Sequence, residues 1–207
     1  MRALLPLLGI AAGPAAMAVI GLTHPGALTP ATAAHWTAMH TVLIPLFPLI
    51  GVNLAWLVAG LPGALPWMVR IAAFGYAVCY PAVDLLAGVG AGLLVTLGED
   101  PLAPTVRAMF ARGNAVGDVG IAALVVGALL ALVTLFPRLR WRVLPGGVLL
   151  LAGVSLFGEH HIYRPWGVFG MVLLALAFAW LLRVRQVAAL SRAPSSSTPR
   201  GAQGFHK

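Results

Sequence analysis

Charged residues are scarce in this chain of 207 residues: they make up 9%, against about a quarter in typical soluble domains. Only one cysteine is present, so an intramolecular disulfide and a cysteine-based metal motif are both excluded. The sequence contains no phosphate loop, nucleophile elbow, dinucleotide fingerprint, CxxCH or HExxH pattern. The local signatures of the common nucleotide-binding, hydrolase, haem-attachment and zinc-protease classes are therefore missing.

Apolar residues are abundant instead, at 60% of the chain with a mean hydropathy of +0.96. A soluble fold of this length could not bury so much apolar surface, so we expect lipid to be the solvent. The sequence predicts an all-α, polytopic helical membrane bundle. The net charge of +8 would suggest nucleic acid in a soluble protein, but the basic residues follow the ends of apolar stretches, and we expect no nucleic-acid partner.

Six apolar stretches are close to the ~20 residues needed to cross a bilayer. They span residues 3–22, 35–59, 68–97, 114–136, 143–162 and 166–182. Together they define a transmembrane domain over 1–186, followed by a disordered, basic cytoplasmic tail over 187–207. Prolines inside the stretches predict kinks, and the third stretch is long enough to require a tilt or a kink at Pro81.

The basic residues also predict the orientation. With the N-terminus inside, ten Lys and Arg residues fall on the inner side and only Arg107, Arg112 and Arg164 on the outer side. Both termini are then cytoplasmic, in a bacterial-type cytoplasmic membrane, and the basic inner face favours anionic lipid head groups. In a rival topology, residues 1–18 form a cleaved signal peptide, since a small-residue site follows an apolar run. Gly-xxx-Gly pairs leave a homo-oligomer open.

Residues 100–113 separate the third and fourth stretches. Asp100 is a good N-cap, Pro101 suits the first helical turn and Gly113 suits a helix stop. Apolar residues recur on one face at helical spacing. The segment predicts a short interfacial helix on the outer surface.

The ionisable residues lie almost entirely on one side of the predicted membrane. All five acidic residues, and five of the six histidines, fall in the outer half or the outer loops. The inner half carries little except its basic border. Any polar site should therefore open outward.

Asp84 is the most informative single residue, because it lies past the middle of the third stretch. A lipid-facing aspartate there would cost about 2.5–3.5 kcal/mol, so the side chain should face the bundle. The pattern Gly88-xxx-Gly92 lies on the same side and permits a close helix approach. We expect Asp84 either to carry a proton or substrate function or to make a structural hydrogen bond.

The remaining candidates are shallower. Asp118 and Glu159 are expected at the outer ends of the fourth and fifth stretches, where ordinary helix starts and interfacial loops also place acids. His160 and His161 could bind a metal, but neighbouring histidines in a helix point about 100° apart and cannot easily share one ion. His40 could be a haem or metal ligand if a second histidine came from the fifth stretch.

Three functions remain open at this point. The first is an outward-facing cavity that binds or transports a proton-linked solute or cation, through Asp84, Glu159, Asp118 and His40. The second is a membrane-embedded redox protein or enzyme that uses haem or a metal at His40, His160 and His161. The third is a non-catalytic accessory or assembly subunit of a membrane complex. The sequence names neither a cofactor nor a substrate.

Overall fold

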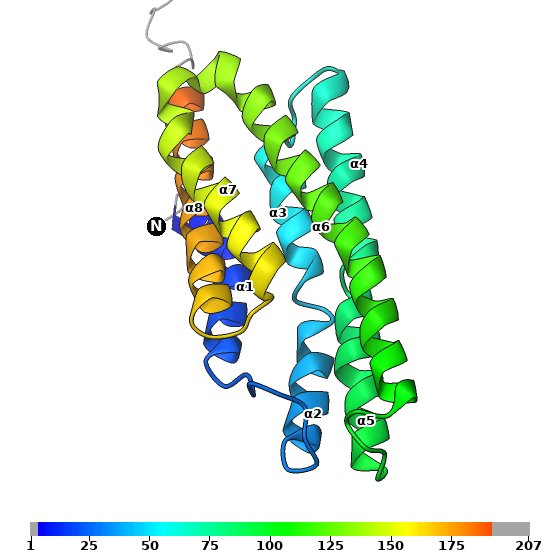
Figure 1. Cartoon of the computed structure of the whole chain (residues 1–207). Coiled ribbons are helices and arrows are strands. Elements are labelled where there is room, and N and C mark those ends of the chain that lie inside the picture. The colour runs from blue at the N-terminus through cyan, green and yellow to red at the C-terminus, as the bar shows by residue number, and fades with distance from the viewer. Residues whose placement is uncertain (1–3, 192–207) are drawn as a thin grey trace, which may run out of the picture.

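The computed structural model describes residues 4–191. Every regular element among them is helical, as Figure 1 shows. The elements are α1 (Leu4–Gly21), α2 (Ala33–Leu43), α3 (Pro48–Leu57), α4 (Ala64–Cys79), the π-helix η1 (Val83–Gly90), α5 (Ala91–Thr96), α6 (Pro104–Leu139), the 3₁₀-helix η2 (Arg140–Val143), α7 (Leu144–His160) and α8 (Trp166–Leu190).

The prediction of an all-helical membrane bundle is confirmed. Five continuous helical segments of the described chain are long and apolar enough to cross a membrane. One of them, Pro104–His160, contains both α6 and α7, which turn back on each other at η2 (Figure 1). The chain therefore forms six rods, close to the number predicted. Large apolar side chains such as Ile71, Phe74 and Val148 are exposed on the outside of the bundle, as contact with lipid requires.

The short interfacial helix predicted at residues 100–113 is not a separate element. Helix α6 begins at Pro104 and runs unbroken to Leu139. Gly113 does not end a helix; it is buried, and a Cβ built on it would lie 3.2 Å from the Ala82 carbonyl oxygen and from the Ala87 nitrogen. The glycine serves close packing of α6 against the preceding rod, which overrides its preference for a helix end.

The predicted boundary at residue 186 also needs correction. Helix α8 continues to Leu190, eight residues beyond the predicted end of the last span at 182. Arg, Gln, Ala and Leu dominate this extension, and all of them are good helix formers. The rest of the predicted tail, 192–207, lies outside the described residues.

Prolines interrupt two of the rods where kinks are predicted. The second rod breaks between α2 and α3 at residues 44–47, next to Pro45 and Pro48. The third changes from α4 to the π-helix η1 just after Pro81. π-Helical turns are rare and are frequent at functional sites. This one contains Asp84.

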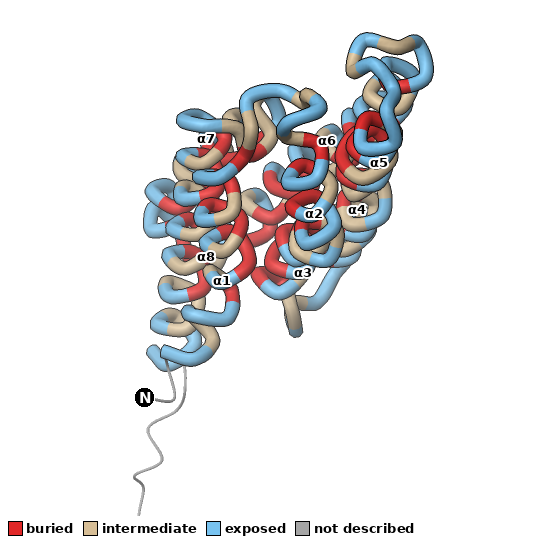
Figure 2. Tube along the Cα trace, turned by 90° about the horizontal axis from the view of Figure 1, so that it is seen from below, coloured by how far each residue is buried: buried red, intermediate tan, exposed pale blue. Residues whose placement is uncertain are grey.

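The two ends of the bundle differ in chemistry. One end, here called the arginine end, contains the α3–α4 connection, the α6–α7 turn and the end of α8 (Figure 1). The opposite end, here called the histidine end, contains the α1–α2, α5–α6 and α7–α8 connections. Buried residues face the interior between the rods (Figure 2). The arginine end carries Arg70, Arg138, Arg140, Arg142, Arg183 and Arg185.

Candidate functional site

Three histidines from separate parts of the chain converge near the histidine end. His24 comes from the α1–α2 loop, His40 from α2 and His161 from the residue after α7. One nitrogen from each ring lies within 4.8 Å of the other two. His24 and His40 are buried; His161 is half-buried as a residue, but its Nε2 is buried. We refer to them as the three-histidine cluster.

The rings of the cluster form a nearly equilateral triangle. Ring centroids lie 5.2 Å apart for His24 and His40, 5.8 Å for His24 and His161, and 5.9 Å for His40 and His161. Imidazoles that bind one ion at 2.0–2.1 Å would have centroids roughly 5 to 5.5 Å apart. The observed triangle is slightly wider than that. Around a tetrahedral ion at this bond length the ligand nitrogens would be about 3.3 Å apart, against up to 4.8 Å here, so the rings would have to move inward to bind one.

Each ring uses its Nδ1 for an interaction that fixes its orientation. His40 Nδ1 lies 2.8 Å from the Trp36 carbonyl oxygen, and His24 Nδ1 lies 2.7 Å from that of Pro25. A carbonyl can only accept, so both Nδ1 atoms carry the proton and both Nε2 atoms keep a lone pair. His161 Nδ1 lies 2.7 Å from the Tyr80 hydroxyl oxygen. Such outer partners are typical of metal-binding histidines.

Two of the three Nε2 atoms are buried without a partner within the described chain. They are those of His24 and His161. An unsatisfied buried polar atom costs about 1–3 kcal/mol. Both Nε2 atoms belong to the three-histidine cluster, where a shared ion would satisfy them.

The backbone at His161 explains how neighbouring histidines are separated. Helix α7 ends at His160, and His161 follows with φ = 50°, a conformation uncommon for a residue other than glycine. The turn directs His161 toward Tyr80 and the cluster, while His160 lies beside Glu159, with 3.7 Å between Nε2 and the carboxylate oxygen. Backbone strain of this kind gathers at functional sites.

The rod that contains the π-helix packs closely against α2, the helix that carries His40. Gly88 faces His40 so closely that an added Cβ would lie 2.4 Å from the His40 Cβ and Cγ. The Trp36 indole nitrogen donates a hydrogen bond to the Ala87 carbonyl, at 3.1 Å. Gly92 lies equally close to Thr37. The close helix approach predicted for Gly88-xxx-Gly92 is therefore confirmed, and its partner is α2.

Burial keeps the cluster in its neutral form. Burial lowers the pKa of His24 despite its carbonyl hydrogen bond, and the neighbouring His35 lowers it slightly further. Burial also places the pKa of His161 well below its usual range, reinforced by His40 and His24. At neutral pH both rings are uncharged and their lone pairs are available. Tyr163, which packs on His24, stays protonated because burial raises its pKa to about 12.

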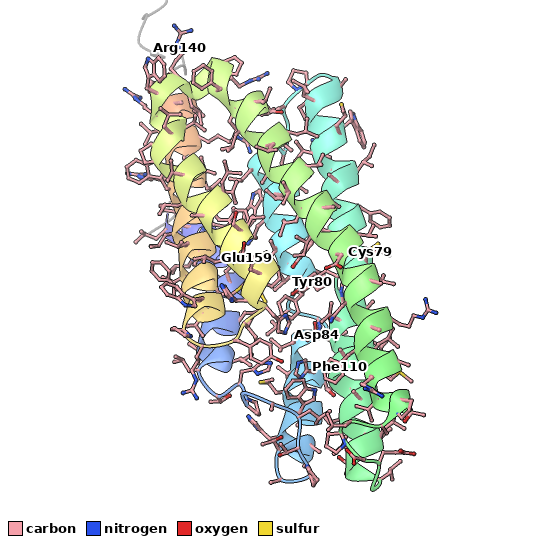
Figure 3. The ribbon with its side chains drawn as sticks, viewed as in Figure 1. Cys79, Tyr80, Asp84, Phe110, Arg140 and Glu159 are labelled. Atoms are coloured by element: carbon pink, nitrogen blue, oxygen red, sulfur yellow. The ribbon has the colours of Figure 1, made fainter. Side chains whose placement is uncertain are left out.

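A polar cavity of about 380 Å³ adjoins the cluster. It lies between α2, α6, the π-helix and the end of α7, and its lining includes Glu159 and Phe110, which are labelled in Figure 3. Its polar lining includes Asn114, Asp118, Glu159, His160, His40 and His161. A small molecule in this cavity would touch two members of the cluster.

Only some of the residues predicted from the sequence lie at the three-histidine cluster. His40 and His161 come together; His160, Glu159 and Asp118 line the cavity beside them, with Glu159 and Asp118 exposed. Asp84 is fully buried and does not line the cavity.

His24 was not among the predicted ligands. It lies in a loop, where no helical periodicity relates it to other residues. The only feature of the sequence that sets His24 apart is its position before Pro25, just after the first span.

The donor set suits a transition-metal ion better than haem. Imidazole nitrogens are preferred by zinc, copper, iron and nickel. A haem bound between His40 and His161 would need its own four nitrogens around the iron. His24 already lies within 5.8 Å of both rings, in the space that the porphyrin would require.

No protein-family model matches the chain, and no curated protein or solved structure is significantly similar to it.

Proposed function

We propose that this protein is a membrane metalloprotein in which His24, His40 and His161 hold one zinc- or copper-class ion. The observation that carries the proposal is that three imidazoles with fixed orientations each bring one nitrogen within 4.8 Å of the other two. It favours the metal-dependent function among the three that the sequence leaves open. Three protein ligands are the usual number at a catalytic zinc, where the fourth position stays open for water or substrate.

The open position would face the polar cavity. His40 and His161 both line it, so a molecule bound among Glu159, Asp118 and His160 could reach the ion. The bound ion would act there as a Lewis acid or as a redox centre. The substrate class that fits is a small polar molecule, given the cavity volume of about 380 Å³.

The cavity would open to the extracytoplasmic side. The arginine end fits the cytoplasmic side by the positive-inside rule, since it carries six of the nine arginines in the described chain. Both termini would then be cytoplasmic. A bacterial-type cytoplasmic membrane fits this distribution.

The packing toward the arginine end favours a resident ion over a transported one. Phe47 and Phe157 are fully buried and their rings lie 5.2 Å and 6.4 Å from that of His161. Tyr76, also fully buried, stacks on Tyr80 in the same layer. An ion moving through the bundle from the cluster would have to displace this aromatic layer.

A competition titration with a zinc indicator, on protein purified in mild detergent, tests the proposal. We expect one site per chain in the wild type, and a loss of at least a hundredfold in affinity in His24→Ala, His40→Ala and His161→Ala. His160→Ala is the matched control, since it removes an adjacent histidine outside the cluster and should keep the affinity within about twofold. A cuprous indicator repeats the test for copper.

Equal affinity in all four variants would overturn the assignment. Zinc flux into vesicles that depends on the cluster would favour the transport alternative instead. Normal folding with no metal binding, together with a co-purifying partner, would favour the accessory-subunit alternative.

A further inference from the structure

Asp84 is a buried acid with no partner. Its exposed fraction is 0%, and neither carboxyl oxygen makes a hydrogen bond within the described chain. An isolated ionised carboxylate in such a place is highly unfavourable, and the group avoids the cost by binding a proton. In the metal-free protein, Asp84 should therefore be a neutral carboxylic acid.

Its position connects it to two ligands of the cluster. Tyr80, Asp84 and Gly88 are spaced four residues apart along one rod, and all three are buried. Tyr80 contacts His161, and Gly88 packs on His40. Figure 3 shows Tyr80 and Asp84 one below the other on this rod. Along the rod, Asp84 thus lies between the residue that contacts His161 and the residue that packs on His40, and it does not line the cavity.

The groups around Asp84 offer it no positive charge. On its own rod, Tyr76 and Tyr80 are close enough to interact with it electrostatically, and both are neutral hydroxyls. On the neighbouring elements, His40 of α2 packs on Gly88 and His161, which follows α7, lies at hydrogen-bond distance from Tyr80, whereas α5 has no titratable residue. The face of α6 toward this rod is built of glycines. Its nearest acid, Asp118, lines the cavity.

We propose that Asp84 is a proton-binding site coupled to the metal site: it holds a proton in the metal-free protein and releases it when a divalent ion binds the three-histidine cluster. The inference rests on the proposed function. The reaction balances as one ion bound and one proton released to solvent, leaving an Asp84 carboxylate that partly neutralises the new charge. Metal affinity then depends on pH through a residue that is not a ligand.

Proton release on zinc binding tests the coupling. In weakly buffered detergent solution near pH 7.5, His24 and His161 are already neutral and release nothing. A metal-bound water could release a proton, but it would do so equally in Asp84→Asn. We expect the wild type to release one proton more per zinc than Asp84→Asn. Glu99→Gln, which changes an exposed acid outside the cavity lining, is the matched control and should behave like the wild type.

Infrared spectroscopy gives a second readout that does not depend on the folding of a variant. The carbonyl stretch of a protonated carboxylic acid should be present in metal-free wild type and disappear on zinc addition. Equal proton release in wild type and Asp84→Asn, or a carboxylic acid band unchanged by zinc, would overturn the coupling. If the wild type binds no zinc, it is the metal site that fails. The two failures are therefore distinguishable.

Discussion

Replacing Gly88 by alanine should disable the metal site from a position that is not a ligand. The new Cβ would lie 2.4 Å from the Cβ and Cγ of His40. Carbon atoms in contact prefer separations of about 3.5–4.0 Å, so α2 must retreat from the π-helix by roughly 1 Å or more. Ligand distances in a metal site tolerate only about ±0.2 Å. His40 should therefore be lost as a ligand.

The change in stability should be smaller than the change in binding. Overpacking of this kind costs about 1–3 kcal/mol, and replacing a helical glycine returns about 0.5–1 kcal/mol. Gly88→Ala should then fold, with a melting temperature modestly lower than that of the wild type. Its zinc affinity should fall at least tenfold, which corresponds to about 1.4 kcal/mol. A competition titration measures the affinity, and thermal unfolding followed by fluorescence measures the stability.

Gly75→Ala is the control on the same rod. A Cβ at Gly75 would meet only the Ala123 Cβ, at the ordinary distance of 3.5 Å. Its zinc affinity should equal that of the wild type. If Gly88→Ala folded and also kept wild-type zinc affinity, the close contact between Gly88 and His40 would not be what positions His40 as a ligand.

Two further predictions concern the tyrosines and the pH. Tyr80→Phe keeps the ring but removes the hydroxyl beside His161, so zinc affinity should fall about 10–100-fold. The Tyr76 hydroxyl has no hydrogen-bond partner in residues 4–191, so Tyr76→Phe should leave the affinity unchanged in the same titration. Equal effects of the two changes would contradict the positioning role of Tyr80. Acidification from pH 7.5 to 5.5 should lower the melting temperature of metal-free Asp84→Asn, in which the buried acid can no longer oppose the effect by holding a proton in the folded protein. Burial lowers the pKa values of His24 and His161 in the folded protein. Below about pH 6.5 the unfolded chain therefore binds more protons than the folded protein. The free energy of unfolding falls by up to ~1.4 kcal/mol per pH unit for each histidine. A melting temperature that is flat or rises on acidification would contradict this.

Apolar run lengths were sufficient to predict the bundle. Lipid forces each run to be helical, so the spans and their connections follow from composition. The exceptions are places where packing overrides local preference. Gly113 is a good helix stop by its local sequence, but the backbone of the π-helix rod lies against it, and α6 continues through it.

Only part of the candidate site could be predicted. Pairing His40 with a histidine of the fifth stretch follows from their shared depth in the membrane. The positive φ at His161 decides that His161, and not His160, turns toward the cluster. The periodicity of apolar residues in the sequence does not predict that angle. His24 depends on how a loop folds over the end of the bundle. That Asp84 faces the bundle could be predicted from its depth in the membrane, but its lack of a hydrogen-bond partner within the described chain depends on how the helices pack.

X-ray absorption spectroscopy of the zinc-loaded protein in detergent shows directly whether the three-histidine cluster holds the ion. We expect three imidazole nitrogens at about 2.0–2.1 Å and one additional light ligand, with loss of an imidazole contribution in His161→Ala but not in His160→Ala. A shell of oxygen ligands without imidazole scattering would place the ion among the cavity carboxylates of Asp118 and Glu159, and would contradict a metal site built by the three-histidine cluster.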